Sequence, residues 1–328
     1  MRSPASKRTR NRSRIPEGAG AIGKYILRRL VMTVPILLGV SVAVFMLVHL
    51  LPGDPVKLML SGTGATQEQE DRLRHQLGLD RPLVNQYVQF VSRAARGDFG
   101  RSIRTNSVVL REIEGGFPDT LKLTLAGMTV AILCGFGMGI IAALNQNTWL
   151  DSVAMIGALL GIAMPSYLLG ILLIYLFAVE LHWLPATGQG SFERLLMPAV
   201  ALGWGYAAII ARLVRASLVE VMRKEFILTA RAKGLTSRHV VYRHAMKNAL
   251  IPVITMLGLQ FGSMLSGAVV VEALFARRGI GSLLVHGILD RDFPMVQAIV
   301  LIMAVIYVVV NLLVDLSYGL LDPRIRYE

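Results

Sequence analysis

Thr229-Ala230-Arg231-Ala232-Lys233-Gly234-Leu235 is the stretch around which the rest of this chain is organised. It stands between two apolar blocks, and a second basic run follows it and ends in Asn248-Ala249-Leu250-Ile251-Pro252. Upstream, residues 220–227 have the mixed spacing of an amphipathic helix, and Gly234 is placed to end that helix with a left-handed cap. The pattern predicts a short surface helix within a loop, not a membrane span.

The predicted loop helix and the segment after it carry two kinds of side chain, small alanines and basic residues. Ala230 and Ala232 are small enough for another protein's surface to approach closely, so we expect a partner to grip the segment there. The basic residues of the loop are expected to stay in water: Arg231, Lys233, Arg238, Arg243 and Lys247. The alternative is that a basic amphipathic stretch of this kind lies on a membrane surface or forms a solvated face.

Composition places the chain among polytopic membrane proteins. Of its 328 residues 54% are hydrophobic, and the mean hydropathy of +0.57 is too high for an ordinary soluble domain. The net charge of +13 lies mostly outside the apolar segments, so it indicates membrane topology and contact with anionic lipid and not nucleic acid. The single cysteine, Cys134, falls inside an apolar run, and no disulfide within the chain is possible.

Six apolar blocks are each long enough to cross about 30 Å of hydrocarbon. The fourth is short and is expected to extend to Arg212 or Leu213. The blocks are Leu30–Leu51, Leu121–Leu144, Val153–Val179, Leu195–Ile210, Ile251–Phe275 and Val296–Leu313. The sequence therefore predicts an all-α integral membrane fold of six transmembrane helices.

The segments between and around these blocks complete the predicted organisation. A large hydrophilic excursion follows the first span, with two short helices near Thr66–Leu77 and Pro82–Ala95. The predicted divisions are a basic disordered tail at 1–24, the first transmembrane helix at 25–51, an extracytoplasmic region at 52–116, a domain of five helices at 117–315 with its loop at 216–250, and a tail at 316–328.

Basic residues indicate the orientation of the chain in the membrane. Six spans place both termini on one side, together with the basic loop from Arg212 to Lys247. Short loops rich in Lys and Arg stay in the cytoplasm, whereas long loops translocate largely regardless of charge. We therefore expect cytoplasmic termini, a cytoplasmic basic loop and an extracytoplasmic excursion.

Enzymatic chemistry finds no support in the residue pattern. The six histidines are dispersed without metal-ligand spacing, and no catalytic or metal-binding constellation is expected. Residues Gly18–Tyr25 come within one residue of a phosphate-binding loop, but Tyr25 replaces the Ser or Thr that would hold magnesium and no strand precedes it. Because the spans are nearly free of ionisable residues, an energy source outside the chain is also expected.

Polar and small residues within the spans have two readings. Gln260, Ser263, Ser266 and Glu272 on the fifth span could line a translocation path, although such groups more often bond helices together. Gly135, Gly137 and Gly139 on the second span predict close helix approach. Pro165 and Pro198 predict either gating kinks or static bends.

Several phrases carry a family resemblance that runs from about Tyr25 to the C-terminus. They are Leu51-Pro52-Gly53-Asp54-Pro55, residues 77–83, residues 97–102, residues 230–234, residues 248–252, Asp292-Phe293-Pro294 and Asp322-Pro323-Arg324-Ile325. Together they resemble the ABC-importer permeases that carry dipeptides, oligopeptides, glutathione or nickel. The general loop pattern of such permeases begins Glu-Ala-Ala, whereas this chain has Leu228-Thr229-Ala230, a departure shared with the peptide branch.

The resemblance implies a type I importer fold and a set of partners. It implies a second related permease subunit, two ABC ATPase subunits and an extracytoplasmic solute-binding protein, in a bacterial inner membrane. The ATPase-coupling residues would be Ala230, Arg231, Ala232, Lys233, Gly234 and Leu235. The chain itself would bind no cofactor, with ATP and magnesium used by the partner ATPase. A self-sufficient channel or secondary carrier with a lipid-binding basic loop is the alternative, a membrane scaffold or receptor a third, and the solute stays open.

Overall fold

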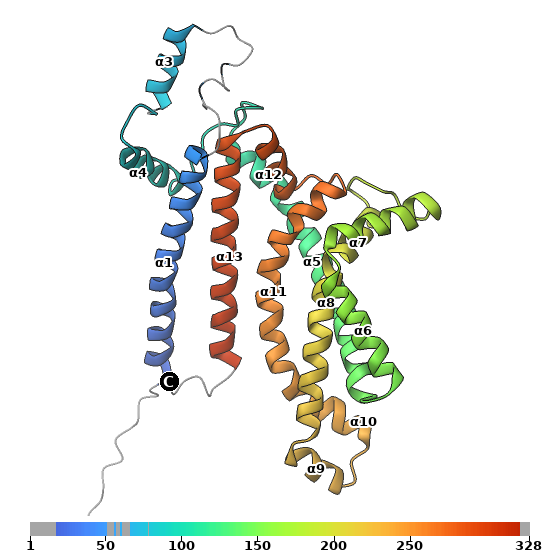
Figure 1. Ribbon diagram of the computed structural model, residues 1–328. Helices are drawn as coiled ribbons and strands as arrows, with labels where there is room; N and C mark the ends of the chain where they lie inside the picture. Colours follow the sequence, from blue (N-terminus) through green and yellow to red (C-terminus); the bar gives the residue numbers. More distant parts are fainter. Residues whose placement is uncertain (1–17, 51–55, 57–59, 61–65, 78, 322–328) are drawn as a thin grey trace, which may run out of the picture.

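The computed structural model describes residues 18–50, 56, 60, 66–77 and 79–321, and the regular secondary structure of this part of the chain is helical apart from an isolated bridge between Arg101 and Val108 (Figure 1). The elements are α1 Gly18–Leu50, α3 Gln67–Leu77, α4 Leu83–Ala94, α5 Val109–Leu144, α6 Trp149–Ala163, α7 Ser166–Leu173, the π-helix η1 Ile174–Glu180, α8 Glu193–Met222, α9 Glu225–Ala232, α10 Ser237–His239, the π-helix η2 Val240–Ala245, α11 Met246–Leu274, α12 Ile280–Leu289 and α13 Phe293–Leu321. The all-α prediction is confirmed.

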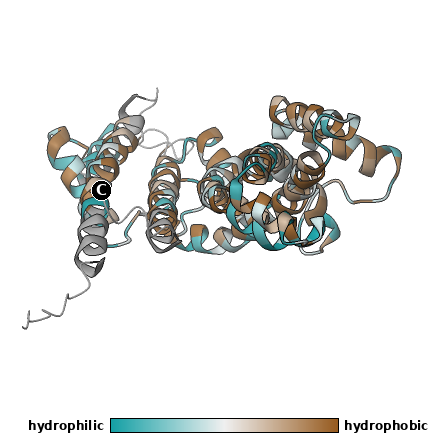
Figure 2. Ribbon diagram, turned by 90° about the horizontal axis from the view of Figure 1, so that it is seen from below, coloured by the Kyte–Doolittle hydropathy of each residue, from teal (hydrophilic) through white to brown (hydrophobic). Residues whose placement is uncertain are grey.

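The long helices run roughly side by side between two ends of the molecule. Helices α9 and α10 hang at one end, which we call the loop end, while α3, α4 and α12 gather at the other, the excursion end (Figure 1). Viewed from below, the spans form an elongated arrangement with α1 far from α6, and much of their outer surface is hydrophobic (Figure 2).

Among the described residues, four helical segments are long and apolar enough to cross a membrane by themselves. They are Val109–Leu144, Glu193–Met222, Ser237–Leu274 and Phe293–Val314. Helix α1 is also long, and its described apolar part covers Val31–Met46. It begins at Gly18, so residues 18–24, expected in the disordered tail, are helical where described, and the Gly18–Tyr25 segment is not a phosphate-binding loop. Ala19, Ala21 and Ile22 extend a helix that the following span already nucleates.

The apolar block Val153–Val179 is broken at Pro165, one of the two prolines expected to kink or bend a span. Helix α6 ends at Ala163, and the pair α6 and α7–η1 bends by 105° at the break. Met164 takes an extended conformation with φ −89° and ψ 118° because Pro165 disfavours helical geometry in the residue before it. The bent pair counts as at most one span, and the six-span count stays a prediction.

Two of the three glycines expected to bring helices together do so. An added Cβ at Gly135 would lie 2.7 Å from the carbonyl oxygen of Ala207, and one at Gly139 would lie 2.7 Å from that of Ala211. Both carbonyls belong to α8, so α5 and α8 pack backbone against backbone. A Cβ at Gly137 would meet nothing within 4 Å, and that part of the prediction is wrong because Gly137 points away from α8.

Several contacts anchor the excursion to the bundle. The two short helices predicted within it are present as α3 and α4, and the hydroxyl groups of Tyr87 on α4 and Ser41 on α1 are hydrogen-bonded at 2.7 Å. Ser102 donates a hydrogen bond to the buried carboxylate of Asp292, which lies directly before α13. Helix α5 begins at Val109, inside the region that was predicted as excursion up to residue 116. It begins there because α5 extends outward by three turns beyond the apolar block Leu121–Leu144.

Candidate functional site

The predicted coupling loop leaves the bundle at the end of α8. That helix stops at Met222, Lys224 is extended with φ −75° and ψ 149°, and α9 then begins at Glu225. The amphipathic helix predicted over 220–227 is therefore two helices with a corner between them. The corner lets Ile227 of α9 turn back and bury itself against Leu218 and Val221 of α8.

Gly234 ends α9 as predicted from the sequence. Its φ is +80°, in the left-handed region that favours glycine, and its amide donates a hydrogen bond of 2.9 Å to the carbonyl of Arg231. An added Cβ at this position would meet no atom within 4 Å. The requirement for glycine is therefore one of backbone conformation and not of space.

The two alanines of the loop helix lie on opposite faces. Ala230 is 8% exposed and packs in a cluster with Leu218, Ile227 and Val240 of the same chain. The expectation that a partner approaches Ala230 is therefore wrong: three residues separate it from Ile227, which places both on the inner face of α9. Ala232 is exposed, as predicted for a position that a partner reaches.

An uninterrupted exposed segment follows Ala230. Every residue from Arg231 to His239 is exposed, and it projects at the loop end together with α9 and α10 (Figure 1). The predicted solvent exposure of the loop's five basic residues is confirmed: Arg231, Lys233, Arg238, Arg243 and Lys247. Large apolar side chains are exposed beside them, with Phe226 at 40%, Leu228 at 60% and Leu235 at 37%. Exposed apolar side chains with cations beside them are typical of a surface that a partner covers.

The helix that carries this loop is tied to its neighbour by an ion pair. Arg215 of α8 donates to both carboxylate oxygens of Asp151 on α6, each at 2.6 Å, in the bidentate geometry of strong charge-assisted pairs. The amide of Asn147, in the turn between α5 and α6, donates to the same carboxylate at 3.0 Å. Asp151 is 5% exposed, so the α5–α6 turn is fixed to α8 two turns before the loop begins.

The four path candidates on α11 separate into two pairs. Gln260 and Glu272 are buried inside the chain, whereas Ser263 and Ser266 are exposed. The Glu272 carboxylate accepts hydrogen bonds from the amides of Gly281 at 2.9 Å and Ser282 at 3.2 Å, at the start of α12. For Glu272 the structure thus favours bonding between elements over contact with a solute.

The exposed pair lies on one exposed stripe of α11. Leu259, Ser263, Ser266 and Val270 are spaced by four, three and four residues, and all four are exposed. Such spacing keeps them on a single helix face. Gln260 lies on a different face of α11 and is buried within the chain. Neither of its amide atoms has a hydrogen-bond partner among the described residues.

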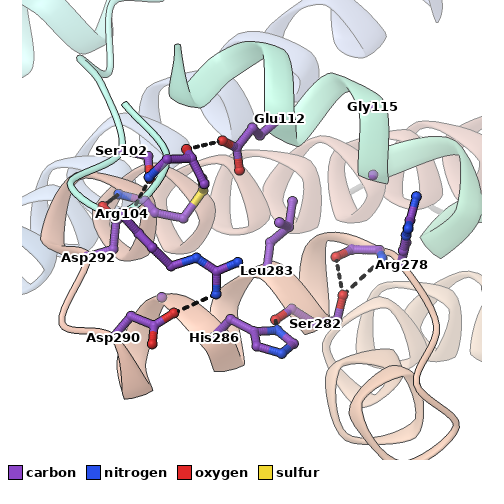
Figure 3. A pocket seen from close by; sticks show the side chains of 15 residues that line it. Ser102, Arg104, Glu112, Gly115, Arg278, Ser282, Leu283, His286, Asp290 and Asp292 are labelled. Atoms are coloured by element: carbon purple, nitrogen blue, oxygen red, sulfur yellow. Dashed lines mark hydrogen bonds and ion pairs between the residues drawn. The ribbon is translucent and has the colours of Figure 1, made fainter. Parts of the chain in front are cut away.

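A polar crevice of about 440 Å³ lies at the excursion end, between the start of α5, α12 and the loop before α5 (Figure 3). Arg104 and Asp290 form an ion pair of 2.8 Å across its floor. Arg278 and His286 line the side formed by α12 and the loop before it, and Glu112 lines the opposite side (Figure 3). Nearby, burial lowers the pKa of Arg277, and the carboxylates of Asp119 and Glu272 oppose that shift.

Sequence reasoning missed the charged pairs that connect distant segments. Asp151 and Arg215 stand at the edges of apolar blocks, and opposite charges in such places usually pair, so a signal was available. For Asp290 and Asp292 the signal was the Asp292-Phe293-Pro294 phrase, because Asp before a helix start is a capping pattern. Arg104 carries no comparable signal in the sequence.

The fold combines several apolar spans with a basic loop whose exposed apolar side chains can contact a partner. This combination defines a class, the membrane-spanning permeases that are driven by an attached subunit. Residues 135–327 match the family described as the binding-protein-dependent transport system inner membrane component, and residues 22–124 match the N-terminal region of such membrane components. The chain belongs to this family, and it is a permease subunit of an ABC importer.

Relatives and solved structures agree with this assignment. The glutathione transport system permease protein GsiC of Escherichia coli (strain K12) is 44% identical over 304 residues, which cover 93% of this chain and 99% of that protein. GsiC of Shigella dysenteriae serotype 1 (strain Sd197) matches to the same extent. A chain of the MetNI methionine ABC transporter in an inward-facing conformation shares the fold, with a TM-score of 0.52 and 21% identity over 66% of this chain and 94% of that one.

Proposed function

We propose that this subunit carries peptides or glutathione-like solutes across the inner membrane. The observation behind the proposal is the 44% identity to GsiC, named for glutathione transport, over 99% of that relative's length. The multi-pass membrane location follows from the spans and the family. The proposed orientation has both termini and the loop end in the cytoplasm, supported by the basic residues of the loop.

The exposed segment of the coupling loop is proposed to dock in a groove of a partner ATPase. Phe226, Leu228 and Leu235 would supply apolar anchors, with Arg231 and Lys233 beside them. Gly234 holds the end of α9 in the geometry that presents them. Two such ATPase subunits would use ATP and magnesium, while this chain would bind no cofactor and catalyse no reaction.

A second, related permease subunit is proposed to face the exposed stripe of α11. Ser263 and Ser266 would then line the path between the two subunits, because a helix face that its own chain leaves exposed is free to border a shared channel. An extracytoplasmic solute-binding protein would deliver the solute at the excursion end. Gln260 and Glu272 are not proposed to line the path, since both are buried within this chain.

Purification of the tagged chain from native membranes tests the assembly. Recovery of a second permease subunit, ATPase subunits in stoichiometric amount and a binding protein is expected, and uptake into proteoliposomes should require ATP inside and binding protein outside. Glutathione and a dipeptide, each radiolabelled, identify the solute class. Solute movement by the chain alone, without ATP, would favour a self-sufficient channel or secondary carrier instead.

A further inference from the structure

Helix α4 of the excursion has an apolar stripe that is only partly covered by the protein. Its apolar residues recur at 83, 84, 87, 88 and 91, the spacing of a strongly amphipathic helix. Leu83, Val84 and Val88 are 49%, 71% and 60% exposed, and no residue of α4 is buried. A stripe of this size would be costly to keep in water.

The contacts of α4 with α1 place it at membrane depth. Tyr87 is hydrogen-bonded to Ser41 at 2.7 Å, and its ring lies edge-on to that of Phe45 with 5.5 Å between the centroids. At 1.5 Å per residue, Phe45 lies about 24 Å along α1 from Arg29, the last cation before the apolar run. The hydrocarbon layer is about 30 Å thick, so the contact with α4 lies inside its far boundary.

The lipid-facing surface of α1 continues onto α4. Val42 and Met46 flank Phe45 on α1 and are 42% and 38% exposed. Tyr87 of α4 packs against Phe45 beside them, so lipid that covers Val42 and Met46 lies next to α4. On the opposite side of α4 from Val84, Gln89 is polar and exposed, as in helices that lie in a membrane interface.

The end of α4 offers cations to lipid headgroups. Arg93, in its last turn, pairs with Asp98 at 2.8 Å, and Arg96 follows immediately and is exposed. Basic residues next to an apolar stripe favour the phosphate groups of anionic lipid.

We propose that α4 is an interfacial anchor: Leu83, Val84 and Val88 lie among acyl chains at the excursion end, and Arg96 lies among the headgroups. The occupant of this surface is the phospholipid bilayer. The inference requires only that α1 crosses the membrane, so it stands apart from the proposals on solute and ATPase.

Spin labels on both faces of α4 test the proposal. The native Cys134 is replaced by Ala, single cysteines are introduced by Val84→Cys, Val88→Cys or Gln89→Cys, and each receives a nitroxide. The full chain, with its co-purifying subunits, is placed in nanodiscs of phosphatidylethanolamine and phosphatidylglycerol. Labels at Leu38 and Val42, both exposed on α1, calibrate depth.

Collisions with oxygen, which concentrates in lipid, are compared with collisions with the water-soluble nickel complex Ni-EDDA. The oxygen-to-nickel ratio is expected to be several-fold higher at 84 and 88 than at 89, and to approach that at Val42. A uniformly low ratio on both faces would place α4 in water and overturn the proposal. Low collision rates with both reagents at 84 and 88 would place a protein subunit there, with the same consequence.

Discussion

Arg215 on α8 holds both carboxylate oxygens of Asp151 on α6, each at 2.6 Å, close to the loop end of the bundle. Replacing Asp151 with Asn should destabilise the chain by about 3 kcal/mol, because a largely buried cation loses its partner. The expected result is a lower midpoint of thermal unfolding in detergent. The same variant should weaken the stimulation of ATP hydrolysis by binding protein, since α8 is then free of the α5–α6 turn.

Arg212→Gln serves as the control for this pair, because Arg212 lies on the same helix and is exposed. The Arg212→Gln variant should keep the midpoint of thermal unfolding and the stimulation of ATP hydrolysis near those of the native chain. Equal effects of the two substitutions would show that the Asp151–Arg215 pair contributes nothing specific.

Ala230 and Ala232 provide a matched pair on the two faces of α9. Ala230→Leu should overpack the cluster with Ile227 and cost about 1–3 kcal/mol in loop stability, seen as faster tryptic cleavage within residues 231–247. Ala232→Leu should leave cleavage unchanged but weaken ATPase binding about tenfold, a loss of about 1.4 kcal/mol. If Ala230→Leu instead leaves cleavage unchanged, Ala230 does not pack as described.

Gly234 should tolerate only residues that accept left-handed backbone. Gly234→Val is expected to cost about 1–2 kcal/mol, because a β-branched residue disfavours φ near +80°. The ratio of ATP hydrolysed to solute imported should rise while the chain still inserts into the membrane. Gly234→Asn should be much milder, since Asn adopts this conformation and no neighbouring atom blocks its Cβ. Normal coupling in Gly234→Val would remove the role assigned to the cap.

Ser263 and Ser266 should change their accessibility during transport, if α11 borders the path. In a Cys134→Ala background, Ser263→Cys and Ser266→Cys should react with a membrane-impermeant thiol reagent at rates that shift when ATP and binding protein are added. Val253→Cys, at a fully buried position of the same helix, is the control that should stay unreactive. Constant rates at both serines in every condition would argue against a path along this stripe.

Glu272 should stabilise the start of α12. Glu272→Ala leaves the amides of Gly281 and Ser282 without their acceptor, which we expect to cost about 1–3 kcal/mol of local stability. Hydrogen exchange measured by mass spectrometry should then accelerate in peptides covering residues 279–285. Glu272→Gln retains an acceptor oxygen and should show a smaller increase. Unchanged exchange in Glu272→Ala would show that other contacts hold α12.

The features that sequence predicted well are those set by local chemistry. Apolar length predicts the spans, and the position of Gly234 after a short amphipathic run predicts its positive φ. Helices α3 and α4 follow from their own periodicity in the same way. The 105° break at Pro165 had its local signal too, but a proline in a span can kink, bend or end it, and neighbouring helices determine which.

What sequence did not predict depends on contacts between distant segments. Ala230 looks as available as Ala232 in the sequence, and only the corner at Lys224 turns one of them inward. Glu272 likewise resembles a path residue until α12, eight residues later, brings its first amides to the carboxylate. The surroundings of Ala230 and Glu272 depend on which distant segments of the chain pack against them, and no local sequence pattern contains that information.

The glycines of α5 also have a mechanical consequence. Because Gly135 and Gly139 let α5 lie with its backbone against that of α8, the two helices cannot slide past each other without colliding and are expected to tilt as one lever. At 1.5 Å per residue the 30 residues of α8 extend for about 45 Å. A tilt of about 10° at one tip would therefore carry the other through about 8 Å. A small rotation of α8 at one membrane surface would thus become a displacement of several ångströms at the other surface.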